Sequence, residues 1–195
     1  MNILNPALTI RAFLFFNWAA WMSGDKVWVH GAVDGVKNAA GTDAISGETI
    51  LGSLAANKEV GYSTYDMFMG FIPGSIGETS TFLIILGGLF LILTGIGSAR
   101  IMLSAVLGAA VMGLIFNGLV DSGVILEGSK FYSLMNFPFW QHLIVGGIAF
   151  GIVYMATDPV SAAQTNTGKI IYGFLIGFFS IMIRVFNPAY PEGVM

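Results

Sequence analysis

The sequence predicts an all-α integral membrane protein, with one membrane domain over its 195 residues. Composition is the first reason, because 55% of the residues are hydrophobic and only 10% are charged, whereas a soluble domain carries about 25% charged residues. So few charges cannot cover a water-facing surface, and most of the surface is expected to face lipid or protein. The second reason is a series of long apolar runs, each near the roughly 20 residues that a spanning helix needs.

Five apolar segments are expected to form a helical bundle, as spanning or re-entrant segments. They are residues 7–22, 81–99, 101–120, 139–157 and 170–186. The first is short and contains Arg11, and the last is interrupted by Arg184 near its end. The runs are apolar all round, as expected where lipid replaces water at the outer face.

Glycine pairs at helical spacing predict close helix packing. Gly147 and Gly151 form one small-xxx-small pair, and Gly173 and Gly177 form another. Such a pair lets two helix backbones approach closely. The alternative is that glycine is simply common in membrane helices.

The distribution of charge predicts the orientation in the membrane. Arg11, Arg100 and Lys169 fall on one side of the alternating segments, and a long acidic stretch, residues 23–80, falls on the other with the loop at 121–130. Short loops rich in Lys and Arg stay in the cytoplasm, so the acidic stretch is expected outside it. Within that stretch we expect a short helix near residues 47–57 and irregular backbone elsewhere.

Several kinds of site are excluded or disfavoured. The chain has no cysteine, which excludes thiolate zinc sites, disulfides and iron–sulfur clusters held by this chain. Its two histidines, His30 and His142, are too few for most haem or metal sites, and His142, beside Trp140, is expected at the membrane interface. There is no basic block, Rossmann motif or Walker motif, so we expect no nucleic-acid partner and no ATPase motor. Redox work would need an organic cofactor, of which flavin is the natural candidate.

Three short motifs could carry chemistry, and each has a plainer interpretation. Thr49 follows Ser46 and Gly47 at an expected helix start, where free N–H groups favour phosphate, although Ser46 could simply be the N-cap. Glu78 precedes an apolar run and could contact a cation or only favour a helix start. Asp158, followed by proline at a helix end, could handle a cation at membrane depth or be a solvated loop acid.

The chain resembles a known family over its whole length, through six stretches in order. They are Asn-Pro-Ala-Leu at 5–8, Arg-Ala-Phe-Leu-Phe-Phe at 11–16, Ser-Gly-Asp at 23–25, Pro-Gly-Ser-Ile-Gly-Glu at 73–78, Met-Ala-Thr-Asp-Pro-Val-Ser-Ala at 155–162, and Ile-Arg-Val-Phe-Asn-Pro-Ala-Tyr-Pro-Glu-Gly at 183–193. These are similar to the NqrB/RnfD family, whose members belong to the Na+-translocating NADH:quinone oxidoreductase (Na+-NQR) and to Rnf complexes. The family protein is about twice as long, so we expect a C-terminal-half fragment, resembling half of a urea-transporter-like bundle.

The resemblance implies a covalent flavin. In this family a flavin transferase joins FMN through a phosphoester to the threonine of an Asp-x-x-Ser/Thr-Gly-Ala-Thr pattern, outside the cytoplasm. The pattern falls here on Asp43, Ser46, Gly47 and Thr49, with Thr49 as the FMN carrier. Glu48 replaces the usual alanine and places a negative charge beside the phosphate.

The resemblance also implies the wider role. It predicts a redox subunit in a bacterial inner membrane that works with the other Na+-NQR subunits, holds a noncovalent riboflavin, and couples electron transfer to quinone with Na+ movement. Glu78 and Asp158 are the candidate Na+ contacts. Two alternatives stay open: a passive channel or solute transporter without flavin, and a purely structural fragment. A flavin that survives denaturation distinguishes the redox role from both.

Overall fold

The protein is mostly helical in its computed structural model, which describes residues 5–18, 27–28, 46–47, 49–58, 60–75, 77–126, 128–129 and 131–187. The helices are α1 (Pro6–Asn17), α3 (Ile50–Ala55), α4 (Thr64–Met69), α5 (Thr81–Leu93), α6 (Ala99–Asp121), α7 (Tyr132–Asn136), α8 (Phe139–Ile144), α9 (Ile148–Phe150), the π-helical turn η1 (Gly151–Met155) and α10 (Asn166–Phe186). The helical part of the predicted fold class is therefore confirmed. The prediction missed one small antiparallel ladder, in which β1 (Val27–Trp28) pairs with β2 (Ser46–Gly47).

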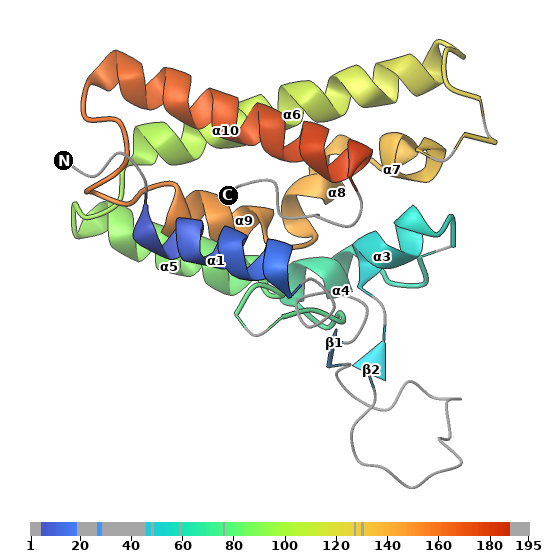
Figure 1. Cartoon of the computed structure of the whole chain (residues 1–195), viewed down its shortest axis with the longest axis horizontal. Helices are drawn as coiled ribbons and strands as arrows, with labels where there is room; N and C mark the ends of the chain where they lie inside the picture. Colours follow the sequence, from blue (N-terminus) through green and yellow to red (C-terminus); the bar gives the residue numbers. More distant parts are fainter. Residues whose placement is uncertain are drawn as a thin grey trace, which may run out of the picture.

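Two helices in the described part of the chain, α6 and α10, are long and apolar enough to cross a membrane. They lie side by side along one edge of the molecule (Figure 1) and run in the same direction. In their first turns, Arg100 of α6 bonds Asn166 of α10, and towards their C-terminal ends the rings of Phe116 and Phe186 lie 5.8 Å apart.

Glycine lets α6 and α10 approach closely, as the 173–177 pair predicts. A Cβ added at Gly173 would lie 2.5 Å from the carbonyl oxygen of Ile101, and one at Gly177 would lie 2.8 Å from the amide nitrogen of Ala109. The other predicted pair, Gly147 and Gly151, does not form a packing face on a single α-helix, because Gly147 precedes α9 and Gly151 begins η1.

The apolar run at 81–99 yields a helix that is shorter than the run. α5 has 13 residues, about 20 Å at 1.5 Å per residue, which is less than the roughly 30 Å of a bilayer core. The helix ends because Gly95 adopts a positive φ of 73° and the N–H groups of Ile96 and Gly97 turn back to the carbonyl of Leu91.

The run at 139–157 is divided by a break. α8 ends at Ile144, Gly146 has a φ of 73°, and α9 begins at Ile148 before passing into η1. Only glycine adopts this left-handed backbone without strain. The expected segment is thus two short helical pieces joined at residues 145–147.

The remaining expected segment and the polar stretch are only partly described. α1 covers residues 7–17 of the expected 7–22 segment and lies in front of α5 in Figure 1. The short helix expected at 47–57 is present as α3. The expectation of irregular backbone elsewhere in residues 23–80 is wrong at α4, where Ser63 and Asp66 form a reciprocal capping box.

The outward surface is apolar, as a lipid-facing surface requires. Leu93 on α5, Leu103 and Leu107 on α6, and Ile171 on α10 are 55–77% exposed. In water such large apolar patches would favour aggregation, whereas in lipid they carry no such cost.

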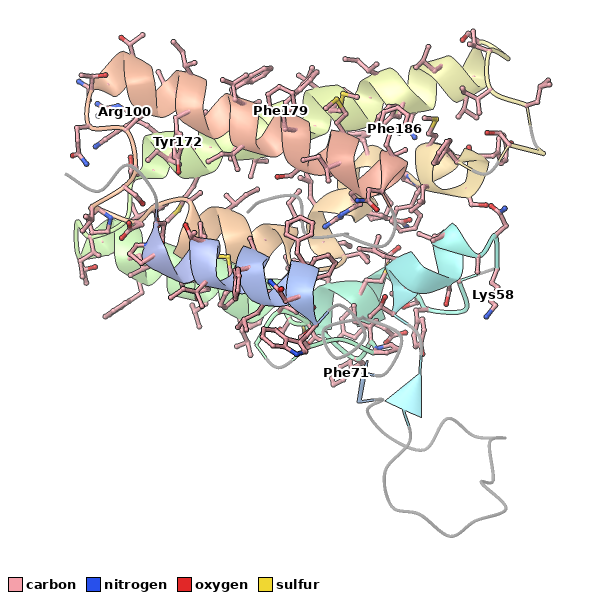
Figure 2. The ribbon with its side chains drawn as sticks, in the orientation of Figure 1. Lys58, Phe71, Arg100, Tyr172, Phe179 and Phe186 are labelled. Atoms are coloured by element: carbon pink, nitrogen blue, oxygen red, sulfur yellow. The ribbon has the colours of Figure 1, made fainter. Side chains whose placement is uncertain are left out.

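Different helices and turns form the two ends of the molecule. The α5–α6 turn and the start of α10 share one end, where Arg100 Nη1 donates to Asn166 Oδ1 at 2.8 Å. α3 and α7 share the other, where Ser133 Oγ donates to Asn57 Oδ1 at 2.6 Å. Figure 2 shows Arg100 and Lys58 at these opposite ends.

Candidate functional site

Thr49 is positioned at the start of α3, directly after the β1–β2 ladder. It has an extended backbone (φ −68°, ψ 160°), and its hydroxyl oxygen accepts a hydrogen bond from the N–H of Gly52 at 3.1 Å. The N-cap is therefore Thr49, and the interpretation of Ser46 as the cap is wrong, since Ser46 lies in β2. Asp43 and Glu48, the other polar members of the motif, lie outside the described residues.

α3 is fixed against the bundle by its apolar side chains. Ile50, Leu51 and Leu54 are at most 6% exposed. The Cδ1 atom of Leu51 lies 2.7 Å from where a Cβ of Gly146 would stand. Thr49, which is half-buried, is thus two residues from a side chain that packs on the helix break.

Arg184 of α10 lies at the same break. It is only 2% exposed, and its Nη1 donates to the carbonyl oxygens of His142 at 2.7 Å and Val145 at 3.0 Å. The last carbonyls of a helix have no partners within the helix and carry partial negative charge. The guanidinium supplies both the hydrogen bonds and the opposite charge, so it closes the C-terminal end of α8.

His142 is buried within the protein, so its expected place at the membrane interface is wrong. It is 1% exposed, its Nε2 lies 3.0 Å from the carbonyl oxygen of Leu134, and its ring meets Phe137 edge-on at 5.1 Å. Its Nδ1 has no hydrogen-bond partner within the part of the chain that the structure describes.

Glu78 lies in the turn before α5 and not inside the helix. Its carboxylate accepts a hydrogen bond from the N–H of Ser75 at 3.3 Å, while its own N–H donates to the carbonyl of Ser75. Ser80, not Glu78, caps α5. The half-buried carboxylate therefore closes a local turn and has remaining oxygen lone pairs to offer a ligand.

Asp158 follows η1 and is also hydrogen-bonded locally. Its Oδ2 accepts from the hydroxyl of Ser161 at 2.5 Å and from the N–H of Ser161 at 3.0 Å. The Ser161 hydroxyl, and to a lesser extent the backbone N–H groups of Ser161 and Val160, lower the pKa of Asp158, because they stabilise the carboxylate.

The two candidate Na+ contacts are not brought together. The hydroxyl of Thr81 bonds the carbonyl of Ile144, and Gly88 packs on Val153, so α5 and the α9–η1 segment run in the same direction. Glu78 precedes the first and Asp158 follows the second, which places them at opposite ends of this layer. Over the described ranges no three His, Asp or Glu side chains gather as a metal site would require.

Comparison with known proteins shows the family. A family model described as NQR2, RnfD, RnfE matches residues 1–195. The chain belongs to this family. Two relatives, from Chromohalobacter salexigens and Stutzerimonas stutzeri, each bear the name of the B subunit of a Na(+)-translocating NADH-quinone reductase, and they are 47% and 49% identical to this chain over 198 and 197 residues. A relative of the same name in Pseudomonas aeruginosa is 46% identical over 197 residues.

The alignments cover all of this chain and 44–45% of each of these three relatives. The chain thus spans slightly less than half the length of the curated relatives it matches. Together with its apolar helices, membership of the NQR2, RnfD, RnfE family identifies the chain as a helical membrane protein.

Sequence reasoning misses two polar residues that organise this family member. The sequence pattern presents Arg184 only as an interruption of an apolar run, although an ionisable residue inside such a run is itself a signal of function. Asn117 of α6 gives no signal. Its amide donates to the carbonyls of Met135 and Phe137 at 2.8 and 2.9 Å, and its oxygen accepts from the N–H of Phe139 at 3.0 Å. It therefore joins the end of α7 to the start of α8.

The hydrogen bonds to Asp158 predict a pH dependence of stability. Because the pKa of Asp158 is lowered on folding, they contribute stability that is present above the unfolded pKa and is lost as the pH falls through the folded pKa. Ser161→Ala removes the main cause of the lowered pKa, the hydrogen bond from the Ser161 hydroxyl. Between neutral pH and about pH 3, the stability of the parent should therefore fall by more than the stability of Ser161→Ala. Unfolding temperatures in detergent across this range measure the difference. Equal losses in the two proteins would contradict the assignment, and Asp158→Asn serves as the control without a titrating group.

Proposed function

We propose that this chain is the flavin-carrying part of the NqrB subunit of a Na+-translocating NADH-quinone reductase, with FMN joined through a phosphoester to Thr49. The relatives named after this subunit are 46–49% identical to the chain. The observation that carries the proposal is the position of Thr49: a half-buried hydroxyl at a helix N-terminus, on an element anchored to the bundle.

The residues around Thr49 fit a phosphate ester. The hydroxyl oxygen serves only as an acceptor towards Gly52, and an ester oxygen retains lone pairs for this bond. The N–H groups of the first turn of α3 and its dipole favour a negative group at this point, although Glu48 adds a charge of the same sign nearby in sequence. When bound, FMN would supply the redox chemistry that side chains lack.

The arrangement of charges supports an extracytoplasmic Thr49. Arg100 and Lys169 border one pocket at the end that holds the α5–α6 turn, whereas α3 belongs to the opposite end, with α7. The positive-inside rule assigns the end with Arg100 and Lys169 to the cytoplasm. A flavin transferase outside the cytoplasm would then reach Thr49.

Two interrupted helical segments support a proposal for the fold of the whole family protein. α4 and α5 are separated by the turn that holds Glu78, and α8 and α9 by the break at 145–147. The two interruptions are adjacent, since Thr81 bonds Ile144 across them. Paired interrupted helices are typical of transport proteins built from repeats, and we propose half of a urea-transporter-like bundle.

The same relatives support a proposal for the role of the whole complex. We propose that the chain works with the other reductase subunits and a noncovalent riboflavin in a bacterial cytoplasmic membrane, where quinone reduction is coupled to Na+ movement. Glu78 and Asp158 are proposed as two separate Na+ contacts near opposite ends of the α5 layer. Arg184 already supplies a positive charge at the helix break, so this break is a poor place for Na+.

The experiment that tests the proposal is the colour of the protein after denaturation. The chain is produced together with its flavin transferase, purified, denatured and separated from free flavin. Absorbance of flavin that stays with the chain, and that is lost in Thr49→Ala, is expected. A colourless parent would reject the covalent flavin and favour the passive channel or the structural role.

A further inference from the structure

A pocket at the Arg100 end of the molecule has no part in the proposed flavin site. Its volume is about 350 Å³, and it lies where α5 turns into α6. The lining residues are Ile92, residues 95–99, Arg100 and Lys169. We propose that it binds the phosphate headgroup of an anionic phospholipid.

The two cations of the pocket come from different helices and are directed to one place by the packing of those helices. Arg100 begins α6, and its guanidinium donates to Asn166 Oδ1 at 2.8 Å on α10. Lys169 lies three residues after Asn166, on the same face of α10, and its carbonyl oxygen accepts from Ser104 Oγ of α6 at 3.4 Å. The pocket is therefore positive from both sides.

No acidic side chain among the described residues pairs with the positive charge of this pocket. Within the described ranges the Arg100 side chain bonds the neutral amide of Asn166, and neither Arg100 nor Lys169 forms an ion pair. A phosphate would supply the missing negative charge, and guanidinium and ammonium groups are its usual ligands in proteins.

The apolar border of the pocket favours a lipid over a free phosphate. Ile92 and Ile96 line the pocket with the two cations, and they are 38% and 62% exposed. A soluble phosphate gains nothing from this surface, whereas the acyl chains of a phospholipid would cover it. Basic pockets between membrane helices on the cytoplasmic side commonly bind anionic headgroups, and the proposed orientation places this pocket there.

The test is lipid binding by the full 195-residue chain, measured by native mass spectrometry in detergent. Dioleoyl phosphatidylglycerol and dioleoyl phosphatidylcholine are compared, because they share acyl chains and differ in charge. We expect tighter binding of phosphatidylglycerol, and a loss of roughly thirtyfold in its affinity in the double variant Arg100→Gln, Lys169→Gln. Equal binding of the two lipids, or an unchanged affinity in the double variant, would overturn the proposal.

Two further variants and one competitor sharpen the test. Lys58→Gln removes a charge from the opposite end of the molecule and should leave the affinity within about twofold. Lys169→Arg keeps the charge and should retain binding; if it binds as weakly as Lys169→Gln, the loss reflects damaged packing and the proposal fails. Inorganic phosphate should not displace the lipid, and displacement at low millimolar concentration would identify a site for free phosphate instead.

Discussion

Replacing Arg184 with glutamine is expected to destabilise the fold by about 3 kcal/mol. The substitution removes a buried guanidinium and leaves the carbonyls of His142 and Val145 without its hydrogen bonds. Water cannot take its place, since Arg184 is 2% exposed. Unfolding of the purified protein by titration with a denaturing detergent measures the change.

The variants that control this prediction separate charge from geometry. Arg184→Lys keeps the charge but cannot reproduce the planar fork of donors, so an intermediate loss is expected. Arg100→Gln removes an exposed arginine with one hydrogen bond, and its effect should stay within about 0.5 kcal/mol. A loss in Arg184→Gln no greater than in Arg100→Gln would contradict the role of Arg184 at the break.

Replacing Gly177 with alanine is expected to force α6 and α10 apart, at a cost of about 2 kcal/mol. The new Cβ would overlap the carbonyl of Ala105 and lie 2.8 Å from the amide nitrogen of Ala109. These are backbone atoms of a long helix, so they cannot move independently of it. The same detergent titration measures the loss.

Gly118 of α6 provides a matched control for this substitution. A Cβ there meets no atom within 4 Å, and alanine is a better helix former than glycine by about 1 kcal/mol. Gly118→Ala should therefore be neutral or stabilising. If Gly177→Ala and Gly118→Ala had the same effect, close contact between α6 and α10 would not explain the glycine at position 177.

The helical architecture could be predicted because lipid selects for long apolar runs. The segments at 101–120 and 170–186 correspond to α6 and α10, and the 173–177 glycine pair lies at their contact. The break at 145–147 could not be placed, because a run of apolar residues gives the same signal whether the helix continues or not. The sequence pattern predicts a packing role for Gly147. In the structure the neighbouring Gly146 has a positive φ, so the helix is interrupted at Gly146 and Gly147.

The candidate site could be predicted only in part, for a similar reason. Thr49 at a helix start follows from local sequence, and α3 begins directly after it. What anchors α3 does not follow, since Leu51, Gly146 and Arg184 are far apart in sequence and meet only after folding. A local pattern also could not reveal that Glu78 and Asp158 lie at opposite ends of one layer.

The most direct test of the central claim, that Thr49 carries FMN, is the intact mass of the chain produced with its flavin transferase. The parent should gain the mass of one FMN less one water, because forming the phosphoester releases water, and Thr49→Ala should lack this adduct. Thr79→Ala is the matched control, because Thr79 follows Gly77 and Glu78 as Thr49 follows Gly47 and Glu48, and it should keep the adduct. An unmodified parent, or an adduct that persists in Thr49→Ala, would contradict the account.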